Sequence, residues 1–370
     1  MVRYMKKLLT IIALSFAMAV CFAFSVGCSN NTQTPTPPPA PPAPDYEYSL
    51  NQNETGVILT KYIGDAEELT KESFSVPAQI DDLPVVELGK NLFRKAGFVT
   101  VTLPDTLTVL GQGSFNSCAS LQSINTSKVE KFSTSCFEGC SQLTTIDLSS
   151  AKTISNKAFY NCKNLIEVSI PNTVSVIGSS AFSSCSRLVT VNLGEGVKKI
   201  EDDAFSGCSA LANIDLSHVE TFGTKAFQAC VTLKSINLDS AVLLPVYVFE
   251  RCNALETVIL GKDLILVFKE TFFKCLNLKS VEFKNPYDWI SVGCSANWNP
   301  DGTRDKWPGW MNPNSLLDPA ANVSKFTFPK EEWSYGHYYA KMEWIKIDTN
   351  NDSCLKPSQI KNLENTKPTY

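Results

Sequence analysis

Residues 182–191 read FSSCSRLVTV, and the same spacing of phenylalanine, cysteine, leucine and a β-branched residue occurs eight times in the chain. Successive copies are 22 or 23 residues apart. Self-similarity at a period of about 20–29 residues is typical of a leucine-rich solenoid, in which each repeat forms one coil. The spacing therefore predicts about nine stacked coils, the first of them with Ala96 in place of cysteine.

Two columns of side chains define the core of the predicted solenoid. The phenylalanines are Phe115, Phe137, Phe159, Phe182, Phe205, Phe227, Phe249 and Phe272. The cysteines are Cys118, Cys140, Cys162, Cys185, Cys208, Cys230, Cys252 and Cys275. Free cysteine behaves as a small buried hydrophobe, so we interpret the second column as packing. The chain has two histidines and its cysteines lie along an axis, which argues against a metal site.

One coil, residues 188–211, shows the local pattern. Residues 191–193 alternate apolar and polar side chains, which predicts a short strand, and glycines then turn the chain. The apolar residues from Ile200 to Cys208 follow at helical spacing, which predicts a helical turn or a short helix. We therefore expect an α/β-type leucine-rich repeat solenoid, with short parallel strands on one face and short helices or turns behind them.

The first 28 residues have the features of an export signal. Residues 1–28 begin with basic side chains, continue as an apolar run and end at a Gly-Cys junction. This junction is similar to a bacterial lipobox and predicts Cys28 as the lipidated residue, although Ser25 stands where such motifs usually have leucine. An uncleaved membrane anchor is the alternative.

The rest of the chain divides into a tether, two caps and the array. Residues 29–45 are rich in proline, which favours an extended spacer. Residues 46–100 are expected to form the N-terminal cap and first repeat, residues 101–283 the repeat array, and residues 284–370 an aromatic-rich C-terminal cap.

The repeat unit is similar to a known family. Residues 170–185, IPNTVSVIGSSAFSSC, resemble the unit of BspA-like leucine-rich repeat surface proteins of bacteria, as does the segment from Leu103 to Cys118. The resemblance covers about residues 76–283. It implies a cell-surface protein, often anchored by lipid or to the wall, that adheres to host or neighbouring-cell molecules. It implies no enzyme activity.

The outward strand positions form the first candidate binding surface. One column of small, polar side chains comprises Asn125, Asp147, Ser169, Asn192, Asp215 and Asn237. Repeat proteins present extended concave surfaces, so this column predicts a protein-binding face. A solvated strand face with no ligand is the alternative.

The C-terminal segment holds the second candidate surface, because all six tryptophans lie there. An aromatic patch could bind sugar or protein, since tryptophan and tyrosine are favoured contact residues. Its members would be Trp298, Trp307, Trp310, Trp333 and Tyr338. The alternative is that these aromatic side chains simply close the last coil.

Two smaller features of this segment leave alternatives open. Cys294 and Cys354 are the unpatterned cysteines of the exported part and could form a bridge. The segment Asp348–Asp352 is similar to the start of a calcium loop, but Ser353 replaces the turn glycine and Gln359 the closing acid. We expect a solvated tail there.

Composition and motifs narrow the function classes. A formal net charge of −4 argues against a nucleic-acid partner. The chain has no Gly-rich phosphate-binding loop and no recognisable set of nucleophile, base and acid, so we expect neither an enzyme nor a cofactor.

Three functions remain: protein recognition through the repeats, carbohydrate binding through the C-terminal aromatic residues, and a purely structural role. The first is our leading hypothesis, for a monomer that is exported, lipid-anchored at the bacterial cell surface and in contact with the membrane only through its lipid.

Overall fold

The computed structural model describes residues 45–264, 266–284, 289–293 and 337–341. The predicted lipidation site Cys28, four tryptophans of the aromatic patch, the Cys294–Cys354 pair and the Asp348–Asp352 loop lie outside these residues. Within the described part of the chain, no helix is long and apolar enough to cross a membrane.

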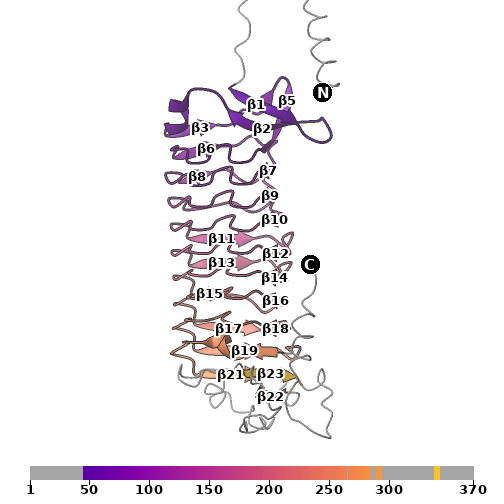
Figure 1. Ribbon diagram of the computed structural model, residues 1–370, viewed down its shortest axis with the longest axis vertical. Coiled ribbons are helices and arrows are strands. Elements are labelled where there is room, and N and C mark those ends of the chain that lie inside the picture. Colours follow the sequence, from indigo (N-terminus) through magenta and orange to yellow (C-terminus); the bar gives the residue numbers. More distant parts are fainter. Residues whose placement is uncertain (1–44, 265, 285–288, 294–336, 342–370) are drawn as a thin grey trace, which may run out of the picture. The chain divides into compact units, whose positions relative to one another are not determined.

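The described chain forms a solenoid of about nine coils, and most coils add one strand to a long sheet (Figure 1). In spatial order this sheet contains β1 (Tyr46–Leu50), β2 (Val57–Tyr62), β5 (Leu83–Leu88), β7 (Val109–Leu110), β9 (Lys131–Phe132), β10 (Thr153–Ile154), β12 (Val176–Ile177), β14 (Lys199–Ile200), β16 (Thr221–Phe222), β18 (Leu243–Leu244), β20 (Leu266–Phe268), β23 (His337–Lys341) and β22 (Trp289–Gly293), with β4 (Gln79–Ile80) beside β5. The strands are parallel from β2 to β20, and antiparallel partners β1, β23 and β22 extend the sheet at its two ends.

Shorter parallel sheets form where most coils place a second strand. They contain β3 (Ser73–Ser75), β6 (Thr100–Thr102) and β8 (Ser123–Ile124); β11 (Glu167–Ile170), β13 (Thr190–Leu193) and β15 (Asn213–Ile214); and β17 (Ser235–Leu238), β19 (Thr257–Leu260) and β21 (Ser280–Phe283). The predicted strand at residues 191–193 is confirmed as part of β13. The predicted solenoid and its parallel strands are therefore confirmed, but most coils carry strands on two faces.

The segment predicted as a helical turn or short helix consists of successive turns. Residue 200 ends β14, and the amides of residues 203–208 donate alternately to the next coil and within their own coil. The Ala204 and Ser206 amides donate within the coil, to Glu201 and Asp203, whereas the Phe205 amide donates to Ala226 of the next coil at 2.8 Å. In an α-helix all these amides would donate within their own coil. Here every second amide donates to the next coil instead, so a stack of turns in register takes the place of a helix. Among the described residues the only helices are 3₁₀ turns, η1 (Ala66–Thr70) and η2 (Lys269–Phe272).

These turns place residues in the left-handed backbone region at two fixed positions. The residues two before and two after the column phenylalanine have positive φ in coil after coil, for example 56° at Asp203 and 75° at Gly207. Most are not glycine; Ala229, equivalent to Gly207, has φ of 60°. The turn geometry therefore overrides the intrinsic cost of this conformation for L-residues.

The phenylalanine column is a continuous stack of buried rings. From Phe115 to Phe272, neighbouring ring centroids are 5.1–5.6 Å apart with interplanar angles of 5–12°. Phe93 of the first coil continues the stack at 5.5 Å. Such spacing is within the range of favourable aromatic pairs, so each ring contributes both buried area and a specific contact.

The cysteine column lies beside these rings, buried and free of disulfides, as the packing interpretation predicts. The structure adds a hydrogen bond that the sequence did not predict. Each column thiol donates to the carbonyl of the phenylalanine in the preceding coil, for example Cys208 Sγ to Phe182 O at 3.2 Å. The eight distances are 3.0–3.3 Å, so these bonds link every coil to the one before it.

Candidate binding surface

The structure places the six predicted column residues on the side of the short strands. Five are exposed and Asn237 is half-buried. Because each coil stacks on the next, the residues form a column along the solenoid, as the repeat spacing predicts. Hydrogen bonds divide five of them into two groups, one committed to the backbone and one displayed on strands, while Asn237 lies in β17.

Asn125, Asp147 and Asp215 bind backbone groups. The amide side chain of Asn125 accepts from Leu103 N at 2.7 Å and donates to Leu103 O at 2.9 Å. Asp147 and Asp215 each accept from the amide two residues on, at 2.9 Å. Such local bonds compete with a strand ladder. Accordingly the coil of Asp147 has no strand on this side, and β15 ends before Asp215.

These bonds also act on the Asp215 carboxylate. Hydrogen bonds from the backbone amide and then the hydroxyl of Ser217 lower the pKa of Asp215. The charged form is therefore stabilised by its own turn. Asp215 acts first as a turn residue, because its side chain bonds the backbone two residues on, as aspartate commonly does in turns; this role was not predicted from the sequence.

Ser169 and Asn192 remain on paired strands and form a polar cluster with Glu167. Ser169 of β11 lies opposite Asn192 of β13 in the sheet register. The Asn192 Nδ2 group donates to Ser169 Oγ and to Glu167 Oε1, both at 3.1 Å. We therefore place the candidate binding surface on β11 and β13, the neighbouring strands visible near the middle of Figure 1.

An apolar feature lies directly beside this cluster. Ile166 and Val189 are 43% and 45% exposed. They occupy the same position in consecutive coils, and Val189 N donates to Ile166 O at 2.8 Å. We call this pair the apolar ledge. In the other coils from residue 122 on, the position holds Gln122, Thr144, Ala212, Lys234, Glu256 and Lys279.

The ledge was not predicted from the sequence, because the predicted surface rested on polar positions alone. The signal was present: two β-branched apolar residues interrupt a mostly polar column in adjacent repeats. Single exposed apolar side chains are ordinary, whereas neighbouring ones form a patch.

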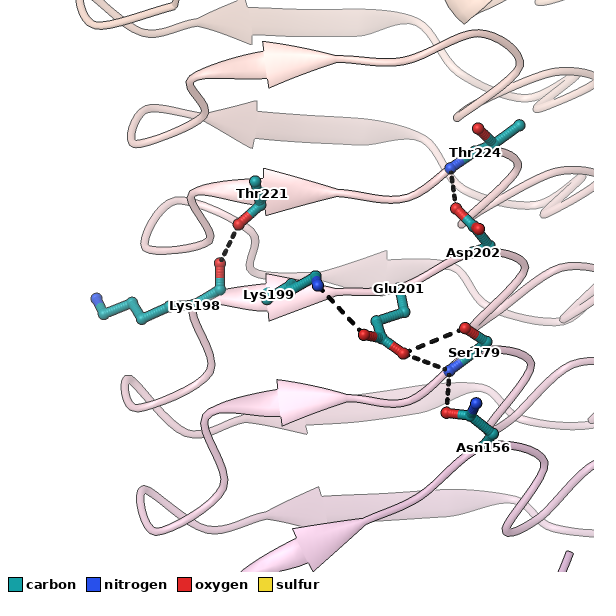
Figure 2. Close-up of polar contacts among 8 residues, drawn as sticks. All are labelled: Asn156, Ser179, Lys198, Lys199, Glu201, Asp202, Thr221 and Thr224. Carbon is teal, nitrogen blue, oxygen red and sulfur yellow. Dashed lines mark hydrogen bonds and ion pairs between the residues drawn. The ribbon is translucent and has the colours of Figure 1, made fainter. Parts of the chain in front are cut away.

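The polar groups beside the long sheet bind one another, as Figure 2 shows. Glu201 Oε2 accepts from the amide and hydroxyl of Ser179 at 3.1 Å, and its other oxygen lies 3.2 Å from Lys199 Nζ. Asn156 Oδ1 also accepts from Ser179 N, at 3.1 Å. These groups join consecutive coils, and this network therefore has a structural role.

Two more contacts in Figure 2 have the same role. Asp202 Oδ1 accepts from Thr224 N at 2.7 Å, and the Thr221 hydroxyl donates to Lys198 O at 3.5 Å. Each bond again connects one coil to the next.

The aromatic patch predicted in the C-terminal segment cannot be assembled from the described residues. Of its five members, Tyr338 alone lies among them, in β23, where its backbone pairs with Phe268 and Val292. The other four lie outside the described residues.

Comparison with known proteins decides the family. The family model for the BspA type leucine rich repeat region, with 6 copies, matches residues 72–187 and 152–279, more than half of the chain. The chain belongs to the BspA-type leucine-rich repeat family. The β11–β13 surface and the ledge lie within the matched BspA-type repeats.

Several solved bacterial proteins are similar to this BspA-type chain. A leucine rich repeat protein of T. pallidum has 30% identity and a TM-score of 0.46, covering 52% of this chain and 90% of that one. A leucine rich cell surface protein of Faecalibacterium prausnitzii has 22% identity and a TM-score of 0.42, covering 68% and 96%. A leucine-rich repeat protein of Bacteroides ovatus has 21% identity and a TM-score of 0.41, covering 66% and 76%. No curated protein matches the chain.

Proposed function

We propose that this protein is a non-enzymatic recognition protein, displayed at the bacterial cell surface, that binds another protein through the β11–β13 surface. The apolar ledge beside the Glu167, Ser169 and Asn192 cluster carries the proposal. The BspA-type repeats support a binding role, since repeat families use their extended surfaces for recognition. The F. prausnitzii structure is described as a cell surface protein, which supports the location.

The ledge favours a protein partner on energetic grounds. Fully burying an isoleucine or valine side chain contributes about 1.5–3 kcal/mol, so covering the exposed part of each ledge residue would contribute roughly 1 kcal/mol. The adjacent amide and hydroxyl groups supply hydrogen bonds around this centre. An apolar centre with a polar rim is the usual arrangement of protein–protein interfaces.

A binding screen with matched variants tests the proposal. The full-length chain, purified in detergent and immobilised, would be exposed to a panel of extracellular matrix proteins and to a glycan array. We expect at least one protein to bind, and the variant I166E/V189E to weaken that binding at least tenfold. The control V176E/V242E changes two apolar side chains of similar exposure, 37% and 36%, on the long-sheet side.

Two results would overturn the proposal. Binding to glycans alone would favour the carbohydrate-binding alternative. Equal binding by the two double variants would place the contact elsewhere on the chain.

The proposal includes export and lipid anchoring at Cys28. In the producing bacterium, Cys28→Ala should move the protein from the membrane fraction to the soluble fraction. Retention of the variant in the membrane fraction would instead support an uncleaved apolar anchor.

A further inference from the structure

One side of the apolar ledge carries two exposed positive charges. Lys163 and Arg187 precede the ledge residues in the same two coils, and both are exposed. Their backbones are in contact, because Arg187 N donates to Lys163 O at 3.2 Å. The two cations therefore stand in adjacent coils at the turn that leads into the ledge.

Neither cation has an acidic partner among the residues that the structure describes. Arg187 Nη1 donates to the neutral Asn164 side chain at 3.2 Å, and Asn164 in turn donates to Gln142 at 3.0 Å. Elsewhere in the array, lysines meet carboxylates of the preceding coil: Lys152 with Glu130, and Lys279 with Glu256, both at 2.9 Å. The side-chain amides of Asn164 and Gln142 position the Arg187 guanidinium, and no described carboxylate pairs with it.

On the strand side, the ledge adjoins the polar cluster, which includes the acidic Glu167. Glu167 accepts a hydrogen bond from Asn192, and it takes part in no ion pair within the described chain. The ledge is thus bordered by two cations at the turn and by a hydrogen-bonded polar cluster on the strands. Because the two borders of the ledge differ in charge, a charged segment would bind across it in one orientation.

We infer that the ledge receives an acidic segment of the partner protein, with an aliphatic or aromatic side chain on Ile166 and Val189 and carboxylates on Arg187 and Lys163. The inference rests on the proposed function and specifies its partner. A guanidinium recognises a carboxylate through two parallel hydrogen bonds, while an ammonium group acts as a point charge. Complementary charge mainly adds specificity and speeds association.

A pair of peptides provides the test. The full-length chain would be titrated into a fluorescein-labelled twelve-residue peptide with two central leucines flanked by glutamates, and into its lysine-flanked counterpart. Fluorescence anisotropy should show the acidic peptide binding at least tenfold more tightly at low salt. The difference should shrink in 0.5 M salt, because salt screens exposed charges.

Charge-reversal variants locate the effect. K163E/R187E should abolish or invert the preference between the two peptides. The control K90E/K128E changes net charge equally at two exposed lysines outside the turn that leads into the ledge, and it should keep the preference. Equal affinities for the two peptides, or the same change in both variants, would overturn the inference.

The outcomes also separate this inference from the proposed function. If I166E/V189E abolishes matrix-protein binding but the acidic peptide has no advantage, the partner is a protein of different chemistry and the inference fails alone. If neither peptide binds and the ledge variant leaves protein binding intact, both fail.

Discussion

The phenylalanine carbonyl explains the preference for cysteine over alanine in the second column. Phe182 O accepts from Cys185 N of its own coil and from Cys208 Sγ of the next, both at 3.2 Å. Alanine would fill the space but donate nothing. The sequence predicted a small buried residue, whereas the sulfur hydrogen bond depends on how two coils stack.

Burial of these thiols predicts a loss of stability at alkaline pH. Desolvation raises the pKa of Cys185 and of Cys275 to about 12, from an ordinary value near 9.0. Between these values the unfolded chain releases the proton and the folded chain keeps it. The free energy of unfolding therefore falls as pH rises above about 9. Below that pH, the buried thiols make their full contribution to stability.

The Cys185→Ala variant tests this linkage. Above the pKa of the unfolded thiol, the free energy of unfolding of this variant should fall less steeply with pH than that of the unsubstituted protein. The two slopes should differ by about one proton, which is roughly 1.4 kcal/mol per pH unit. Denaturant titrations at several pH values from 8.5 to 10.5 would measure the slope. An unchanged slope would show that this thiol ionises equally in the folded and unfolded chain.

At the left-handed turn positions, two reciprocal substitutions should change the free energy of unfolding in opposite directions. Ala229→Gly should raise the free energy of unfolding by up to about 1 kcal/mol, because glycine adopts positive φ without strain. Gly207→Ala should lower it by a similar amount, since the new Cβ would meet its nearest neighbour at an ordinary 3.7 Å and only the φ penalty remains. Chemical denaturation of both variants measures the two effects. Changes of the same sign would contradict the turn assignment.

At the scale of elements, the side-chain columns and the strands of the shorter sheets could be predicted, whereas the long sheet could not. The alternation at residues 191–193 identifies β13, but a strand such as Lys199–Ile200 has two residues and no period to detect. Buried residues from Ile200 to Cys208 at helical spacing also arise from consecutive turns. Only the amide bonds between coils distinguish the two.

The candidate surface was predicted only in part, again because some of its bonds join different coils. The column of Ser169 and Asn192 follows from repeat spacing, and the structure confirms that both lie on paired strands. The backbone bonds of Asn125 join it to another coil and cannot be seen in one repeat. The ledge was visible in the sequence as an exception to a polar column.

Asn125 provides a prediction at this scale. Asn125→Ala removes two hydrogen bonds to the Leu103 backbone and should lower the free energy of unfolding by about 1–3 kcal/mol. Ser169→Ala, in the same column but bonded to a side chain, should cost less than about 1 kcal/mol. Thermal or denaturant unfolding measures both. Equal costs would contradict the structural role assigned to Asn125.

At the scale of the whole molecule, each coil contacts mainly its neighbours, so one complete coil should be removable. Deleting residues 209–230 joins Cys208 to the next coil in register and leaves the ledge intact. We expect a folded protein with cooperative unfolding, lower stability and unchanged partner binding, because stability is nearly a sum of coil and interface contributions.

A half-coil deletion is the control for this experiment. Removing residues 209–219 would shift the phenylalanine and cysteine columns out of register. Circular dichroism should then show a broad transition or none. Similar transitions for the two deletions would contradict stacking in register.

We propose that the β11–β13 surface receives the partner protein. Hydrogen–deuterium exchange of the full-length chain, with and without the tightest-binding protein of the matrix panel, would locate the contact. We predict slower exchange in peptides that cover residues 163–170 and 187–193, and little change in peptides that cover β12 and β14 on the long-sheet side. Slower exchange confined to residues outside these two segments, such as the C-terminal segment, would contradict the proposal.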